Sequence, residues 1–139
     1  MTAESASNNH DMTSFDIHAA PTSVGMMQVD GVSTRVDASG ALTILSNTNT
    51  CIVEMASFSG LTSWQRHQDD ELLQIMEGEV DVTILAENEV CKTTLKKDSI
   101  FIVPRGLWHN QSSPKGVKLI FITSQQGNET SEEHPRVST

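Results

Sequence analysis

The chain has 139 residues, contains no Tyr, and carries a formal net charge of −9. This length suits a single domain with its own core, and the acidic balance argues against a nucleic-acid partner or an anionic membrane surface. No apolar run approaches the roughly 20 residues of a membrane-spanning helix, and the N-terminus lacks the basic and apolar regions of a secretory signal. We therefore expect a cytoplasmic protein in which Cys51 and Cys91 remain reduced.

The predicted elements begin after a polar, Ser- and Asn-rich stretch at residues 1–14, which we expect to be a mobile arm. Short β-prone runs then follow one another at Val24–Val29, Thr34–Val36, Ala41–Leu45, Cys51–Ala56, Leu72–Met76, Val80–Leu85, Cys91–Leu95, Ser99–Val103 and Val117–Ile122. We expect turns between them, among others at Glu77-Gly78 and at residues 113–116. Residues 124–139 are polar and show neither a helix nor a strand signal. The predicted division is a mobile arm (1–14), one barrel domain (15–123) and a polar tail (124–139).

A series of short strands without a helical pattern indicates an all-β domain, either an antiparallel sandwich or a barrel. A closed or double-sheet arrangement is preferred because it leaves few exposed strand edges. The pattern alone does not choose between an immunoglobulin-like sandwich and a jelly roll.

Gln65 and His67 are the first candidate ligands of a metal ion. Side chains two positions apart on a strand point to the same face, so these two could converge inside a barrel. Glu71 follows a polar turn and opens an apolar strand, and His109 follows a Pro-Arg-Gly turn. Two imidazoles and a carboxylate on a rigid β framework form a sensible ligand set for a divalent ion. An alternative register, in which Asp69 is the ligand beside His67, stays open.

Both segments resemble the paired motifs of the cupin superfamily. The residues that keep the spacing of the two motifs are His67, Glu71, Gly78, Pro104, Gly106 and His109. The chain departs from the first motif at Gln65, where cupins commonly have a His, and its leading glycine, Gly60, stands one place late. In the second motif Asp98 replaces the leading Gly and Ser113 replaces the closing Asn.

The resemblance implies a cupin-type double-stranded β-helix, which is a jelly-roll barrel, with one divalent metal ion per chain. The implied ligands are Gln65, His67, Glu71 and His109. Because a Gln carbonyl oxygen is a harder and weaker donor than imidazole, Fe(II), Mn(II) or Ni(II) is favoured, and Zn(II) is also possible. Without Gln65, the set has the composition of the facial triad of non-haem iron oxygenases.

The function that the resemblance implies is a metal-dependent enzyme acting on a small organic substrate inside the barrel. A dioxygenase-like reaction is marginally preferred over a lyase or isomerase reaction, with Glu71 as a proton acceptor. The alternative is a non-catalytic cupin module that binds a small ligand, with or without metal. Small cupins often form homodimers through N-terminal strands, so the resemblance implies a homodimer. Val24–Val29 is a candidate for such a strand, and a strand inside the chain's own sheet is the equal alternative for it.

Overall fold

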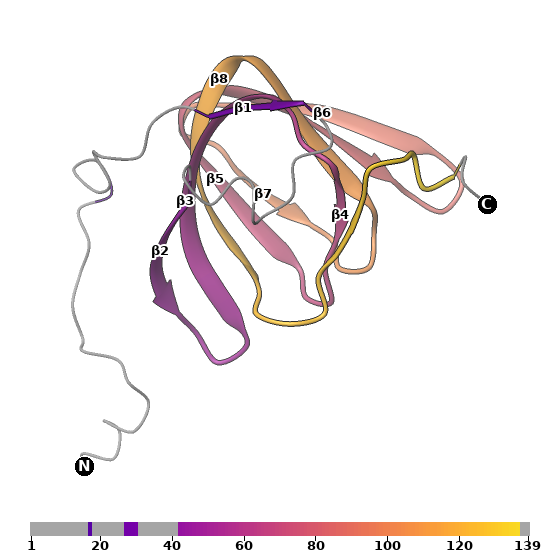
Figure 1. The fold of residues 1–139 in the computed structure, drawn as a ribbon, viewed down its shortest axis with the longest axis horizontal. Helices are drawn as coiled ribbons and strands as arrows, with labels where there is room; N and C mark the ends of the chain where they lie inside the picture. Colours follow the sequence, from indigo (N-terminus) through magenta and orange to yellow (C-terminus); the bar gives the residue numbers. More distant parts are fainter. Residues whose placement is uncertain (1–16, 18–26, 31–41, 137–139) are drawn as a thin grey trace.

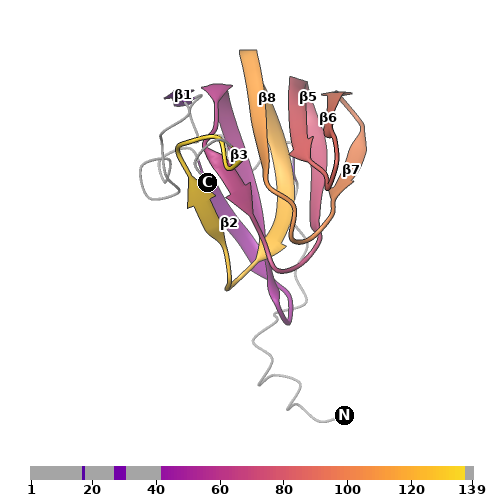
Figure 2. The same ribbon diagram turned by 90° about the vertical axis from the view of Figure 1, so that its right-hand side faces the viewer.

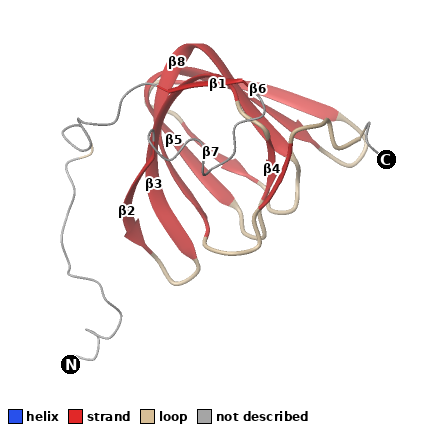
Figure 3. Cartoon of the chain, in the orientation of Figure 1, coloured by secondary structure: helices blue, strands red, loops and turns tan. Residues whose placement is uncertain are grey.

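The computed structural model describes residue 17, residues 27–30 and residues 42–136. Within these residues the chain forms strands and no helix, which confirms the all-β prediction (Figure 3). The strands are β1 (Met27–Asp30), β2 (Leu42–Asn47), β3 (Cys51–Leu61), β4 (Trp64–Arg66), β5 (Glu71–Leu85), β6 (Val90–Lys96), β7 (Ile100–Val103), β8 (His109–Ser124) and β9 (Glu129–Ser131). The arm predicted at 1–14 and the strand predicted at Thr34–Val36 lie outside the described residues.

Three long strands form the centre of the sheet. Strand β8 pairs antiparallel with β3 on one side and with β5 on the other, nearly along its whole length. Strands β2 and β7 extend one half of this centre, and β4, β6 and β9 extend the other half. Strand β1 runs parallel to the end of β3. The sheet curls around a common interior, as expected for a jelly roll (Figures 1 and 2).

One hydrophobic core fills this interior. Burial alternates along β5, so that Leu73 and Ile75 from its first half and Val82 from its second half belong to the same buried cluster. This cluster also takes Val117 and Leu119 from β8. Both halves of the long strands therefore face the same interior, which is possible only because the strands bend in the middle.

The bends occur where the sequence suggested turns, and the turn predictions at Glu77-Gly78 and at residues 113–116 are wrong. Strands β5 and β8 run through both positions. Gly78 and Gly116 have φ angles of +78° and +105°, a conformation that favours glycine. A Cβ atom on Gly78 would lie 2.2 Å from the carbonyl oxygen of Gly116, so the two strands cross with no room for a side chain. Here glycine bends the strands without reversing them.

The opposite end of the molecule carries the loops that follow β4, β7 and β8 (Figure 1). The backbone N–H of Gly106 donates to the carbonyl oxygen of His67, over 2.9 Å, and joins the first two loops. The polar segment that follows Ser124 is ordered against them, because β9 pairs with β4 through Trp64↔Ser131 and Arg66↔Glu129. The sequence pattern missed this strand.

Candidate metal centre

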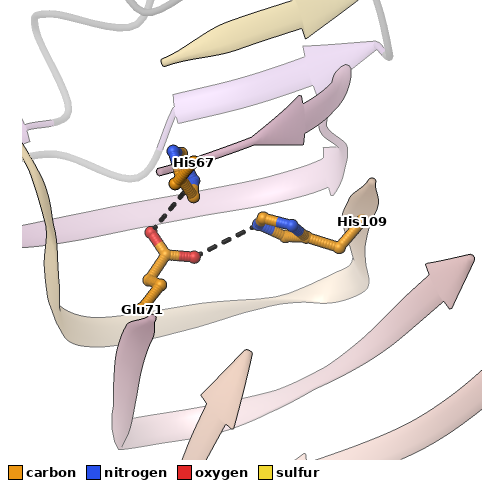
Figure 4. Close-up of side chains that lie close together, drawn as sticks. All are labelled: His67, Glu71 and His109. Carbon is orange, nitrogen blue, oxygen red and sulfur yellow. Dashed lines mark ion pairs between the residues drawn. The ribbon is translucent and has the colours of Figure 1, made fainter. Parts of the chain in front are cut away.

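Three side chains from separate elements meet at the loop-bearing end (Figure 4). His67 directly follows β4, Glu71 is the first residue of β5, and His109 is the first residue of β8. Glu71 lies between the imidazoles, with its Oε2 at 3.5 Å from His67 Nε2 and its Oε1 at 3.2 Å from His109 Nε2. One ligand atom from each residue lies within 4.8 Å of the others, so the group could hold a metal ion.

The tautomer of His67 is set by the residue that contacts its other ring nitrogen. His67 Nδ1 lies 2.7 Å from the side-chain oxygen of Asn128. The Asn128 amide nitrogen donates to the Ser124 carbonyl oxygen over 2.9 Å, and this contact turns the amide oxygen toward the ring. Because that oxygen can only accept, His67 Nδ1 carries the proton and Nε2 has a free lone pair.

The Nδ1 atom of His109 also carries a proton, because it contacts a backbone carbonyl oxygen of its own loop. Its Nδ1 donates to the Leu107 carbonyl oxygen over 3.2 Å, which leaves the lone pair on Nε2. When the two imidazoles are neutral, both ring nitrogens that face Glu71 are therefore acceptors.

The three facing groups are buried and lack a hydrogen-bond donor. The exposed fractions of His67, Glu71 and His109 are 8%, 3% and 1%. Within the described residues, no hydrogen bond satisfies Nε2 of either histidine or Oε1 of Glu71. Buried polar atoms of native proteins are almost always satisfied, so three acceptors that converge on one point require a cation or an extra proton between them. This donor set fits a divalent metal ion.

Glu71 is in the charge state that such an ion needs. Burial by itself raises the pKa of the Glu71 carboxyl, but its interactions with the side chains of His109, His67 and Thr123 outweigh burial and hold the pKa below its ordinary value. The carboxylate is therefore ionised at neutral pH.

The two remaining candidate ligands lie in different environments. Gln65 stands directly opposite His109 in the β4–β8 pair, and opposite residues of an antiparallel pair share a face. Its backbone position is thus compatible with ligation, which stays a prediction. Asp69 is occupied elsewhere: its carboxylate accepts a hydrogen bond of 3.1 Å from the Ser124 hydroxyl, and its backbone N–H donates to that same hydroxyl over 3.0 Å.

Aromatic contacts at the rim tie the C-terminal segment to β4. Arg66 forms an ion pair with Glu129, and its guanidinium lies 4.6 Å from the centre of the Trp108 ring. Trp64 meets His134 edge-on, with 5.0 Å between the ring centres. Trp64 thus packs against His134, which is partly buried there.

Comparison with known proteins identifies the architecture. A family model described as Cupin matches residues 42–137. The chain is similar to the cupin-2 domain protein of Shewanella frigidimarina NCIMB 400, with 20% identity, a TM-score of 0.52, and coverage of 60% of this chain and 79% of that one. Among curated proteins, no sequence matches the chain.

Two similar structures are enzymes. The hydroquinone 1,2-dioxygenase of Sphingomonas sp. TTNP3 matches with 13% identity and a TM-score of 0.55, over 63% of this chain and 66% of that one. An oxalate oxidase in complex with glycolate matches with 23% identity and a TM-score of 0.54, over 65% of this chain and 54% of that one. At these identities the similarity concerns the fold alone.

Proposed function

Because this chain belongs to the cupin family, we propose that it is a metal-dependent enzyme acting on a small organic substrate inside its barrel. The observation that carries the proposal is the convergence of three buried acceptors, from His67, Glu71 and His109, with no hydrogen-bond donor among the described residues to satisfy them. One divalent ion per chain would supply the missing positive charge. Fe(II), Mn(II) or Ni(II) is preferred, with Zn(II) as a further possibility.

His67, Glu71 and His109 would hold the ion, and the side-chain oxygen of Gln65 would be a fourth ligand. When bound, an ion with two His ligands and one carboxylate offers open positions at which it can polarise a substrate or activate O₂. We favour a dioxygenase-like reaction over a lyase or isomerase reaction for this reason. The fold similarity to a dioxygenase and an oxalate oxidase agrees with this choice and does not fix it.

The chain's own residues would handle the proton and orient the substrate. Glu71 is ionised and buried, so it can accept a proton from a substrate hydroxyl or C–H group beside it. Gln111 lies two positions after His109 on β8 and therefore on the same face. Its buried Oε1 has no hydrogen-bond partner among the described residues and can accept a hydrogen bond from a polar substrate.

A non-catalytic module that binds a small ligand is the second candidate. Gln65 favours it, because an amide in place of the usual imidazole weakens metal binding. Such a module would bind its ligand without turnover.

Elemental analysis tests the metal site. Protein prepared without chelators would be measured by plasma mass spectrometry beside His67→Ala, with His134→Ala as the control, since His134 lies at the rim against Trp64. We expect about one ion per chain in the wild type and in His134→Ala, and a loss of metal in His67→Ala. No metal in the wild type, even after reconstitution with Fe(II), Mn(II), Ni(II) and Zn(II), would reject the enzyme proposal and leave the ligand-binding module.

We also propose that the chain forms a homodimer through the outer face of the sheet. On the other side of β5, beside a second buried cluster of Met55, Met76 and Ile120, the register aligns Ile102, Leu72, Ile122 and Val53 in one apolar row across four strands. Ile102 is 46% exposed, and Ile100, its neighbour on the edge strand β7, is 62% exposed. Leu72, Ile122 and Val53 are half-buried, so the exposed part of the row is its end on β7. Exposed apolar side chains of this kind are typical of protein interfaces. Ile102→Asp should convert a dimer to a monomer in light scattering, and a monomeric wild type would contradict the proposal.

We also propose that the protein is located in the cytoplasm. Cys51 and Cys91 are both free thiols, and disulfide bonds are rare in that compartment. No helix in the described part of the chain is long and apolar enough to cross a membrane.

A further inference from the structure

We infer that Asn128 is a positioning residue for His67, and that the C-terminal segment, residues 124–131, is an integral part of the metal centre. The inference rests on the metal site proposed above and adds a residue to it that is 61 positions away from the ligand it orients.

The Asn128 side chain is held in one orientation by two contacts. Its amide nitrogen donates to the carbonyl oxygen of Ser124, and its amide oxygen faces His67 Nδ1 at 2.7 Å. Both ends of the amide are used, and a rotation by half a turn would place its oxygen against the Ser124 carbonyl oxygen, which cannot donate. Asn128 therefore selects the tautomer with the proton on Nδ1.

The tautomer of His67 decides which of its ring nitrogens can bind a metal ion. A neutral imidazole carries one N–H and one lone pair, and only the nitrogen with the lone pair can bind a metal ion. With the proton on Nδ1, His67 presents the lone pair of Nε2 to Glu71 and to the metal position. Without Asn128, the ring can carry its proton on Nε2 or turn away, and either change removes a ligand. Partners of this kind typically change metal affinity by about 10–100-fold.

The loop containing His67 contacts the C-terminal segment at more than one point. The buried hydroxyl of Ser124 accepts from the Asp69 backbone and donates to the Asp69 carboxylate. Gly127 has a φ of +76° and packs so closely that a Cβ atom would lie 2.4 Å from Gln68 Oε1. Three consecutive loop residues, at positions 67–69, thus contact the segment.

The tautomer of His109, unlike that of His67, is set within its own loop. Its Nδ1 bonds to the carbonyl oxygen of Leu107, two residues away in its own loop, so its tautomer does not depend on a distant side chain. An effect of Asn128 on metal binding should therefore act through His67 alone.

The test compares Asn128→Ala and Asn128→Asp with the wild type and with Gln125→Ala as a matched control. Gln125 lies in the same turn, but its side chain donates to the carbonyl oxygens of Thr48 and Cys51, away from His67. Two quantities would be measured: the imidazole ¹⁵N chemical shifts of His67 in metal-free protein, which report the tautomer, and the Kd for Mn(II).

In the wild type and in Gln125→Ala we expect the proton on Nδ1. Asn128→Ala should lose this preference and raise the Kd by about 10–100-fold. Asn128→Asp should restore the tautomer, because a carboxylate oxygen also accepts from Nδ1–H, although it loses the hydrogen bond to the Ser124 carbonyl oxygen. An Asn128→Ala protein that keeps the wild-type tautomer and Kd would overturn the inference. A wild type that binds no Mn(II), Fe(II), Ni(II) or Zn(II) would overturn the proposed function, and the ¹⁵N shifts would still decide the role of Asn128.

Discussion

At one end of the barrel, which carries His67, Glu71 and His109, polar contacts join loops from distant parts of the chain. At the other end, β5 and β8 approach each other at Gly78 and Gly116, where no side chain separates the two backbones. The two places are seven residues apart along β5, or about 23 Å in an extended strand. At the first end a changed side chain alters ligands and their orientation. At the second end, any added side chain must push two central strands apart.

This difference means that metal binding and folding stability should respond to different substitutions. Distant sites with no shared partners usually contribute independently. Substitutions at each end can therefore test whether metal binding and folding stability depend on different residues.

The largest effect is expected from His109→Ala. The variant removes an imidazole that is almost completely buried and contacts Glu71, so the metal content should fall from about one ion per chain to nearly none. Thermal unfolding should still be cooperative, because the core cluster on β5 and β8 is untouched. Full metal content in folded His109→Ala would show that the second motif does not contribute a ligand to the site.

Gly78→Ala should give the next largest effect, and on stability alone. The new methyl group would lie 2.2 Å from the carbonyl oxygen of Gly116, and φ at +78° is unfavourable for alanine. We expect a loss of about 2–4 kcal/mol in the free energy of unfolding, measured by denaturant titration. The metal content per folded molecule should not change. A parallel loss of metal would show that the two ends are coupled.

Gln65→His should have a smaller effect, in the favourable direction. Imidazole is a better donor than an amide oxygen, and Gln65 lies opposite His109 on the same face. The Kd for Ni(II) should fall by about tenfold, equivalent to about 1.4 kcal/mol. Calorimetric titration would measure it, and an unchanged Kd would mean that the side chain at this position points away from the ion.

Gly106→Ala should have the smallest effect and is the matched control for Gly78→Ala. Gly106 has the same φ of +78°, but a Cβ atom there would meet nothing within 4 Å. Only the backbone strain remains, which costs about 1 kcal/mol. Equal losses of stability in both glycine variants would mean that backbone strain alone, and not the close approach of β5 and β8, explains the need for glycine at position 78.

Much of the site could be predicted from short-range spacing. The position of Glu71 at the start of a strand follows from the polar turn before it and the apolar residues after it, and the structure begins β5 there. Motif spacing also identified His67 and His109, which the structure brings together with Glu71. Such predictions succeed because each depends on a few neighbouring residues.

The features that were missed depend on contacts across the chain. Gly78 has the same local signature in a turn and in a bent strand, and only its crossing with Gly116 decides between them. Asn128 lies in a polar stretch without periodicity, and its importance comes from a histidine 61 residues earlier. Asp98 stands at the glycine position of the second motif and has a φ of 71°, so the backbone keeps the glycine-like conformation even without the glycine.

The contact between His67 and Asn128 also has a consequence for the order of folding. Strands β3, β5 and β8 can pair before β9 pairs with β4. At that stage every proposed ligand is present, but Asn128 does not yet orient His67. Tight metal binding should therefore follow the docking of residues 124–131.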